Sequence, residues 1–187
     1  YIWAPDANPL DITGDLEIVI KVAPTSWTAS EQVLVAKEQS TSTRTFRFAF
    51  TTASKPYLAF SIDGSTPITA LSANAVAFSA AETAWLKVTR ASATGSVVFS
   101  TATNQASEPS SWTPLSTVAS TSGALFSGSS ILEVGARSGG TVQRLTGNVF
   151  RVIVRNGIGG STVADFDSQL SGRTGYTDAF GNVWTIT

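Results

Sequence analysis

The last third of the chain constrains the fold more than any other segment. From Val149 to Thr187 it reads VFRVIVRNGIGGSTVADFDSQLSGRTGYTDAFGNVWTIT, in which a long alternating stretch is followed by a glycine-rich break and shorter alternating stretches. Because successive side chains of a β-strand point to opposite faces, Phe150, Val152 and Val154 are predicted to share one face. The pair Gly181-Asn182 provides the residue types that a tight turn needs. The segment therefore predicts paired strands at the end of an all-β chain.

The same alternation runs through the rest of the sequence, interrupted at short intervals by Gly, Asn, Asp, Pro and Ser. About twelve to fourteen strands are expected, without linker or repeat, and this number favours a two-sheet antiparallel jelly-roll sandwich that spans residues 1–187 as a single domain. The stretch between Ala70 and Ala84 is ambiguous, with a loop and one helical turn as alternatives. The side chains expected in the core are those of Leu16, Ile18, Ile20, Phe46, Phe48, Phe150, Val152 and Val154.

Composition excludes several kinds of chemistry. The chain has no Cys and no His, so disulfides, thiol catalysis, Ser-His-Asp catalysis and histidine metal sites are all excluded. The formal net charge is −1, from 12 basic and 13 acidic residues that are scattered singly, and nucleic acid is therefore not an expected partner. No apolar run approaches the roughly 20 residues of a membrane helix, so membrane insertion is not expected.

Several short motifs follow one another in a set order along almost the whole chain: residues 14–18 (GDLEI), 34–37 (LVAK), 85–88 (WLKV), 111–112 (SW), 132–135 (LEVG) and 147–151 (GNVFR). This order resembles that of concanavalin A-like (laminin G-like) domains. More narrowly, residues 4–6 (APD), 10–15 (LDITGD) and 163–167 (VADFD) resemble the version found in minor tail proteins of phages that infect actinobacteria.

The resemblance implies a virion-surface module, extracellular and carried on a phage tail or particle as part of a longer or multi-subunit protein, with a homo-oligomer as one arrangement. Its expected function is non-catalytic host attachment, with a host cell-surface glycan as partner. The alternative is a purely structural decoration or assembly domain that binds only other virion proteins. Arg151 and Arg155 share one strand face, and a contact with an acidic glycan is the second interpretation of them, after that of solubilising charges.

The carboxylates are the candidates for catalysis, because glucanases share this type of fold. Such relatives carry three carboxylates on one strand face, and a retaining mechanism needs two of them about 5–5.5 Å apart. The sequence offers the pairs Asp15/Glu17 and Asp165/Asp167, each on one strand face, and neither pair continues to a third acid. We therefore expect no enzyme and no catalytic residue, and glycan hydrolysis is the least favoured function.

A calcium site is the second interpretation of the acidic strand end. Ca²⁺ takes six to eight oxygen ligands, normally with two or more carboxylates. Asp165 and Asp167, joined by Asp6, Asp11 or Asp178 from neighbouring loops, are the candidates in this sequence. No Asp-x-Asp-x-Asp-Gly loop is present. A solvated strand end is the preferred interpretation, so no cofactor is expected.

The tryptophans are the candidates for sugar stacking. Trp85 and Trp184 lie in strands beside apolar residues and are expected to be packed, and Trp3 is expected to hold the first strand on the sandwich. Trp27 and Trp112 lie in the polar segments PTSWTASEQ and EPSSWTP and are expected to be accessible. They are the predicted carbohydrate-binding residues, with loop anchoring as the alternative role.

Overall fold

A computed structural model describes residues 1–170 and 174–187 of the protein. In this part of the chain fourteen strands form two antiparallel sheets, and the only helical elements are the 3-10 turns η1 (Asn8–Leu10) and η2 (Ser168–Leu170). The strands are β1 (Ile2–Ala4), β2 (Leu16–Pro24), β3 (Gln32–Lys37), β4 (Phe46–Phe50), β5 (Pro56–Phe60), β6 (Ile68–Leu71), β7 (Ala84–Arg90), β8 (Ser96–Thr103), β9 (Thr113–Ala119), β10 (Leu132–Val134), β11 (Gly147–Asn156), β12 (Ser161–Asp167), β13 (Gly175–Thr177) and β14 (Val183–Ile186). The predicted two-sheet antiparallel jelly-roll sandwich is confirmed.

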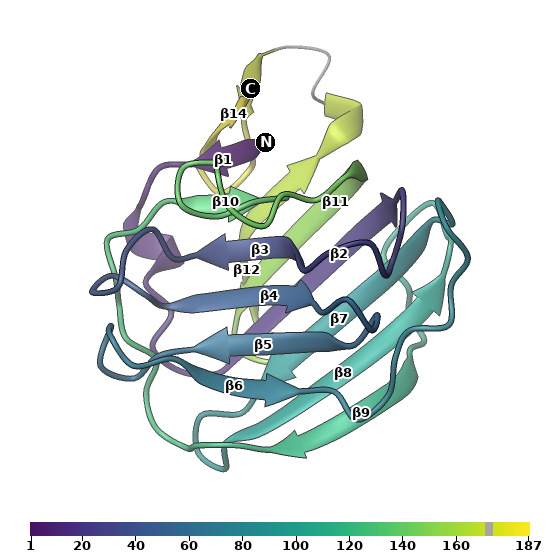
Figure 1. The fold of residues 1–187 in the computed structure, drawn as a ribbon. Coiled ribbons are helices and arrows are strands. Elements are labelled where there is room, and N and C mark those ends of the chain that lie inside the picture. Colours follow the sequence, from purple (N-terminus) through teal and green to yellow (C-terminus); the bar gives the residue numbers. More distant parts are fainter. Residues whose placement is uncertain (171–173) are drawn as a thin grey trace.

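The two sheets are stacked, and their strands run at an angle to each other (Figure 1). The larger sheet has the order β13-β14-β1-β10-β3-β4-β5-β6, and the smaller has the order β12-β11-β2-β7-β8-β9. Each sheet turns one face towards the other sheet; the face turned away is its outer face. The ambiguous stretch after Ala70 is a loop between β6 and β7 with a hydrogen-bonded turn from Ser79 to Glu82. None of the described helices is long and apolar enough to span a membrane.

Alternation in the strands builds the core between the sheets. Seven of the eight residues expected there are at most 1% exposed, namely Leu16, Ile18, Ile20, Phe46, Phe48, Val152 and Val154. The rings of Phe48 and Phe99 stack across the two layers with centroids 6.4 Å apart. Trp184 also lies in this core, as expected. Trp85 is fully buried too, but it packs on the outer face of the six-stranded sheet.

Phe150 is the exception, and its predicted burial is wrong. The register of β11 against β2 shifts between Val149 and Arg151, because Val149 pairs with Val22 and Arg151 with Lys21. One extra residue in a strand reverses the alternation on one side of the irregularity. Val149 therefore packs against the core, while the ring of Phe150 is half-buried near the Lys21 ammonium, 5.7 Å from its centroid.

The closing hairpin of β13 and β14 joins the sheets. The Asp178 carboxylate accepts hydrogen bonds from the backbone N–H of Asp165 in β12 and from the indole N–H of Trp184, both at 3.0 Å. The Asn182 side chain donates to the carbonyl of Val163 at 2.8 Å. Side chains of the hairpin thus occupy hydrogen-bonding groups on the free edge of β12. The same hairpin adds two strands to the eight-stranded sheet.

Candidate functional site

Trp27 is buried, so the predicted accessibility of its ring is wrong. Its side chain is 3% exposed and packs against Phe50 and Phe78, with ring centroids 5.3 and 5.5 Å away. The indole N–H donates to the carbonyl of Ser79 at 3.0 Å, and this bond satisfies the one polar atom of the ring. A ring without an exposed face cannot stack on a sugar. The structure thus removes the premise for Trp27 as a carbohydrate-binding residue.

Trp112 is half-buried on the outer face of the six-stranded sheet. It packs beside a small apolar cluster that includes Val19, Trp85 and Ile153. The ammonium of Lys87 lies 4.5 Å from the ring centroid, which is within the range of a cation–π contact. Trp112 keeps an exposed part, so sugar stacking there remains a prediction.

The loop before Trp112 is fastened across the same outer face. The carbonyl of Gln105 accepts hydrogen bonds from the Lys21 ammonium at 2.6 Å and from the Trp85 indole at 3.2 Å. The carboxylate of Glu108 forms a bidentate pair with Arg155 at 2.9 and 2.6 Å. These contacts cover the apolar cluster, and they fit the loop-anchoring role considered for Trp112.

The arginines for which contact with an acidic glycan is the second interpretation are both paired within the protein. Arg151 forms a bidentate pair with Asp165 at 3.0 and 2.8 Å. Arg155 contacts Glu108 and Glu17, and these hydrogen bonds raise the pKa of its guanidinium, those with Glu108 most. Two guanidinium groups thus contact three carboxylates on this face. The arrangement fits structural ion pairs rather than a site for an anion.

The carboxylates weighed for catalysis also have structural partners. Asp15 accepts hydrogen bonds from the backbone N–H and the hydroxyl of Ser92 at 2.7 and 2.8 Å, and these bonds lower the pKa of its carboxyl. Glu17 is 5% exposed and accepts from Arg155 and from the N–H of Gly159. The pair thus has the structural role that was its preferred interpretation.

Each carboxylate considered for calcium already has a partner within the protein. Asp165 pairs with Arg151 and Asp167 accepts from the N–H of Gln169, while the Asp178 carboxylate is enclosed in the closing hairpin. The other two candidates, Asp6 and Asp11, lie beside the Lys37 ammonium. Within residues 1–170 and 174–187, no group of three or more acidic side chains lies close enough together to hold a metal ion.

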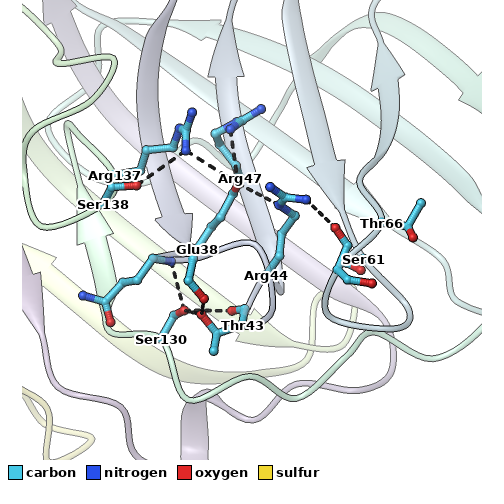
Figure 2. A network of polar contacts seen from close by, with 12 residues as sticks. Glu38, Thr43, Arg44, Arg47, Ser61, Thr66, Ser130, Arg137 and Ser138 are labelled. Atoms are coloured by element: carbon cyan, nitrogen blue, oxygen red, sulfur yellow. Dashed lines mark hydrogen bonds and ion pairs between the residues drawn. The ribbon is translucent and has the colours of Figure 1, made fainter.

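The structure assembles a polar group that sequence reasoning missed. Three arginines converge on Glu38 at the outer face of the eight-stranded sheet, and we call Glu38, Arg44, Arg47 and Arg137 the arginine cluster (Figure 2). Arg44 Nε lies 2.8 Å and Arg137 Nη1 3.7 Å from Glu38 Oε1, and Arg47 Nη1 lies 3.3 Å from Oε2. The Glu38 side chain is 3% exposed, whereas those of Arg44 and Arg47 are 15% and that of Arg137 is 24% exposed. The carboxylate therefore lies beneath partly exposed guanidinium groups.

Strand register explains this convergence. Lys37 pairs with Phe46 at the end of the β3–β4 ladder, so Glu38 and Arg44 lie on opposite sides of the connecting loop. Arg47 is in β4 opposite Ala36, with its side chain on the outer face. Arg137 reaches the cluster from the segment after β10.

Neighbouring loops hold the cluster in place. Ser130 donates its hydroxyl to the carbonyl of Thr43 at 2.7 Å and accepts from the N–H of Gln39 at 3.0 Å, which ties the β3–β4 loop to the segment before β10 (Figure 2). Arg137 Nε donates to Gln143 Oε1 at 2.6 Å. Arg47 lies over the ring of Tyr57, with its guanidinium carbon 5.5 Å from the centroid. The side chains are thus positioned in advance of any ligand.

The cluster presents donors rather than acceptors. A guanidinium group carries five N–H donors and no acceptor. Arg47 Nε is buried without a hydrogen-bond partner among the described residues, so contact with a ligand would fall to the Nη groups of this partly exposed side chain. Such a surface suits a ligand rich in oxygen acceptors. The segment FRFAF at residues 46–50 shows only that Arg47 alternates with the phenylalanines of β4. Nothing in the sequence links Arg137 to Glu38, because their contact depends on how β10 and the hairpin after it fold onto β3.

No protein-family model matches the sequence, and no curated protein is significantly similar to it. Solved structures do share the fold. The chain is similar to the CBM40 domain of the Ruminococcus gnavus IT-sialidase bound to α2,3-sialyllactose, with 14% identity over 83% of this chain and 85% of that one and a TM-score of 0.60. It is also similar to a heptameric SAP-like pentraxin from Limulus polyphemus (11%, 83% and 75%, TM-score 0.56) and to domains LG4-5 of the mouse laminin α1 chain (15%, 81% and 38%, TM-score 0.56). These neighbours are all concanavalin A-like sandwiches, which agrees with the resemblance noted in the sequence.

Proposed function

We propose that this protein is a non-catalytic carbohydrate-recognition module that binds host-surface glycans from a phage tail or other virion surface. The observation that carries the proposal is the arginine cluster, in which partly exposed guanidinium groups are held by Glu38 at one sheet face. Sugar hydroxyls are hydrogen-bond acceptors as well as donors, and specificity in ligand sites comes from a few well-placed polar groups.

The comparisons support carbohydrate recognition in general, because a neighbour of the same fold is a carbohydrate-binding module bound to an oligosaccharide. The phage part of the proposal rests on the sequence alone, where residues 4–6, 10–15 and 163–167 resemble phage minor tail proteins. The non-catalytic part is supported by the pairing of Glu17 with Arg155 and of Asp165 with Arg151. Both pairs hold carboxylates in structural contacts.

Binding to whole cells tests the proposal. A single sugar site binds weakly, so the domain should be displayed in several copies on a scaffold to gain avidity. We expect the multimerised domain to sediment with actinobacterial cells and to be released by the soluble polysaccharide of their walls. Binding that disappears after protease treatment of the cells but survives polysaccharide competition would contradict a glycan partner. A domain that ignores cells and binds only other virion proteins would support the structural alternative.

A further inference from the structure

We infer that the glycan bound at this face carries an anionic group, a carboxylate or a phosphate, which Arg47 and Arg137 contact while Arg44 and Glu38 position them. This inference rests on the proposed function and names the chemical class of its ligand. It follows from the charges at the cluster, from the way each guanidinium is bonded, and from a comparison with the opposite face of the same molecule.

The pairing of guanidinium groups with carboxylates differs between the two outer faces. At the arginine cluster three guanidinium groups share one carboxylate, that of Glu38, within 4.0 Å. On the outer face of the six-stranded sheet two guanidinium groups, those of Arg151 and Arg155, share three carboxylates. The Lys21 and Lys87 ammonium groups add positive charge to that second face, but its guanidinium groups are already bonded to carboxylates, whereas those of the arginine cluster share a single one. Arg pairs with carboxylate and phosphate groups through two parallel hydrogen bonds, which gives geometric selectivity as well as energy.

Other acidic residues near the cluster are held by their own donors. Glu133 is fully buried and accepts from the N–H of Gly140 at 3.0 Å. Glu31 accepts the hydroxyl of Tyr57, the residue beneath Arg47. Asp63 accepts from the N–H groups of the loop that also bonds Arg44. These charges reduce the local potential, but none of the three forms an ion pair with the cluster within 4.0 Å, so the guanidinium groups keep donors for a ligand.

The existing bonds assign different roles to the three arginines. Arg44 donates from Nε to Glu38 at 2.8 Å and from Nη1 to the carbonyl of Ser65 at 2.5 Å, so it is fixed at both ends (Figure 2). Arg47 contacts Glu38 only from Nη1, at 3.3 Å or more, and its side chain is 15% exposed. Arg137 uses Nε for Gln143 and lies 3.7 Å from Glu38. Arg47 and Arg137 are thus the less committed groups and the ones we assign to the ligand.

The test compares a carboxylated polysaccharide with its uncharged form and with a phosphate polymer. Biosensor binding of the multimerised domain should be measured on polygalacturonate, on the same polymer after its carboxyl groups are reduced to alcohols, and on poly(glycerol phosphate). The variant is Arg47→Gln, which keeps polar character and removes the charge. The matched control is Arg151→Gln, which removes one arginine from the opposite face. Circular dichroism and the melting temperature of each variant verify that it is folded.

We expect binding to polygalacturonate or to poly(glycerol phosphate) that weakens at least tenfold in Arg47→Gln, with less than a twofold change in Arg151→Gln. Binding to polygalacturonate should also weaken at least tenfold when its carboxyl groups are reduced. Arg47→Lys should recover only part of the loss, because an ammonium has the charge without the planar fork. Preference for the carboxylate or the phosphate polymer identifies which anion the cluster accepts.

Two results separate this inference from the proposed function. Equal binding to polygalacturonate and its reduced form without binding to poly(glycerol phosphate), or binding to cells that survives Arg47→Gln, would overturn the anionic ligand and leave glycan recognition standing. Binding to neither cells nor any polysaccharide would overturn both. Equal losses in Arg47→Gln and Arg151→Gln would show a non-specific charge effect and would also refute the assignment.

Discussion

Asp6→Asn should leave the buried Lys37 ammonium without its nearest carboxylate. The Lys37 ammonium is fully buried and lies 2.6 Å from Asp6 Oδ1 and 3.6 Å from Asp11 Oδ1, and it also donates to the carbonyl of Gly128. At an effective dielectric constant of about 20, these two separations correspond to gross attractions of about 6 and 5 kcal/mol. Desolvation offsets most of this gross attraction.

Removing one partner of a buried pair typically costs about 3–5 kcal/mol. Here Asp11 remains, and the Asp6 side chain is itself 31% exposed, so we expect Asp6→Asn to cost about 2–3 kcal/mol. For a domain of this length that loss lowers the melting temperature by about 4–12 °C. Asp11→Asn is the matched control. It should cost less, because its carboxylate is 1.0 Å farther from the ammonium (3.6 against 2.6 Å).

Urea unfolding of a double-mutant cycle measures the coupling. Lys37→Met removes the buried ammonium and leaves carboxylates that water can reach, so it should cost less than Asp6→Asn. The double variant should be more stable than the sum of the two single losses predicts, because it contains no buried ammonium that has lost its carboxylate partner. Additive losses, or a loss for Asp11→Asn equal to that for Asp6→Asn, would refute the assignment of Asp6 as the principal partner of Lys37.

Three further predictions follow from burial, exposure and titration. Trp27→Ala should lower the free energy of unfolding by about 3–5 kcal/mol, because the ring fills the core; chemical denaturation measures this, and a loss below about 1 kcal/mol would contradict the packing. Trp112→Ala should leave the fold intact; weaker cell pull-down would support sugar stacking at this residue, and unchanged pull-down would refute it. The pKa of Asp15 is lowered by hydrogen bonds from Ser92, so its stabilisation is present above its unfolded pKa of about 3.9 and is lost as the pH falls through the lower folded value. Asp15→Asn should therefore flatten the acid limb of stability against pH, and urea titrations between about pH 5 and pH 2 would show an unchanged slope if this reasoning is wrong.

Period-two alternation predicted the sandwich because burial of one sheet face imposes that period on every strand. It predicted the burial of Val152 and Val154 correctly. It failed at Phe150, where a register irregularity adds one residue to β11 and reverses the phase. An irregularity of this kind depends on the partner strand, β2, and no local pattern in the sequence marks it. Alternation therefore predicts a face only over an uninterrupted ladder.

The candidate site was less predictable because it depends on loops. Trp27 lies in a hydroxyl-rich segment, which suggests exposure, yet the sandwich leaves a place for its ring beside Phe50 and Phe78. Glu38 and Arg137 are far apart in the sequence and meet through sheet order and a hairpin contact. Whether a loop residue is exposed or buried thus depends on what packs above it, and the local sequence does not show this.

The net charge of the chain alone does not predict how salt affects the binding of an anion at the arginine cluster. A chain with a formal net charge of −1 exerts little long-range attraction on an anion, and from that value alone binding should not depend on salt. Salt limits the attraction exerted by the arginine cluster to distances near the Debye length of about 8 Å at physiological ionic strength. This attraction therefore acts mainly at contact and should slow dissociation more than it speeds association. If the ligand is anionic, raising the salt concentration should increase the dissociation rate of the wild-type domain and change that of Arg47→Gln much less.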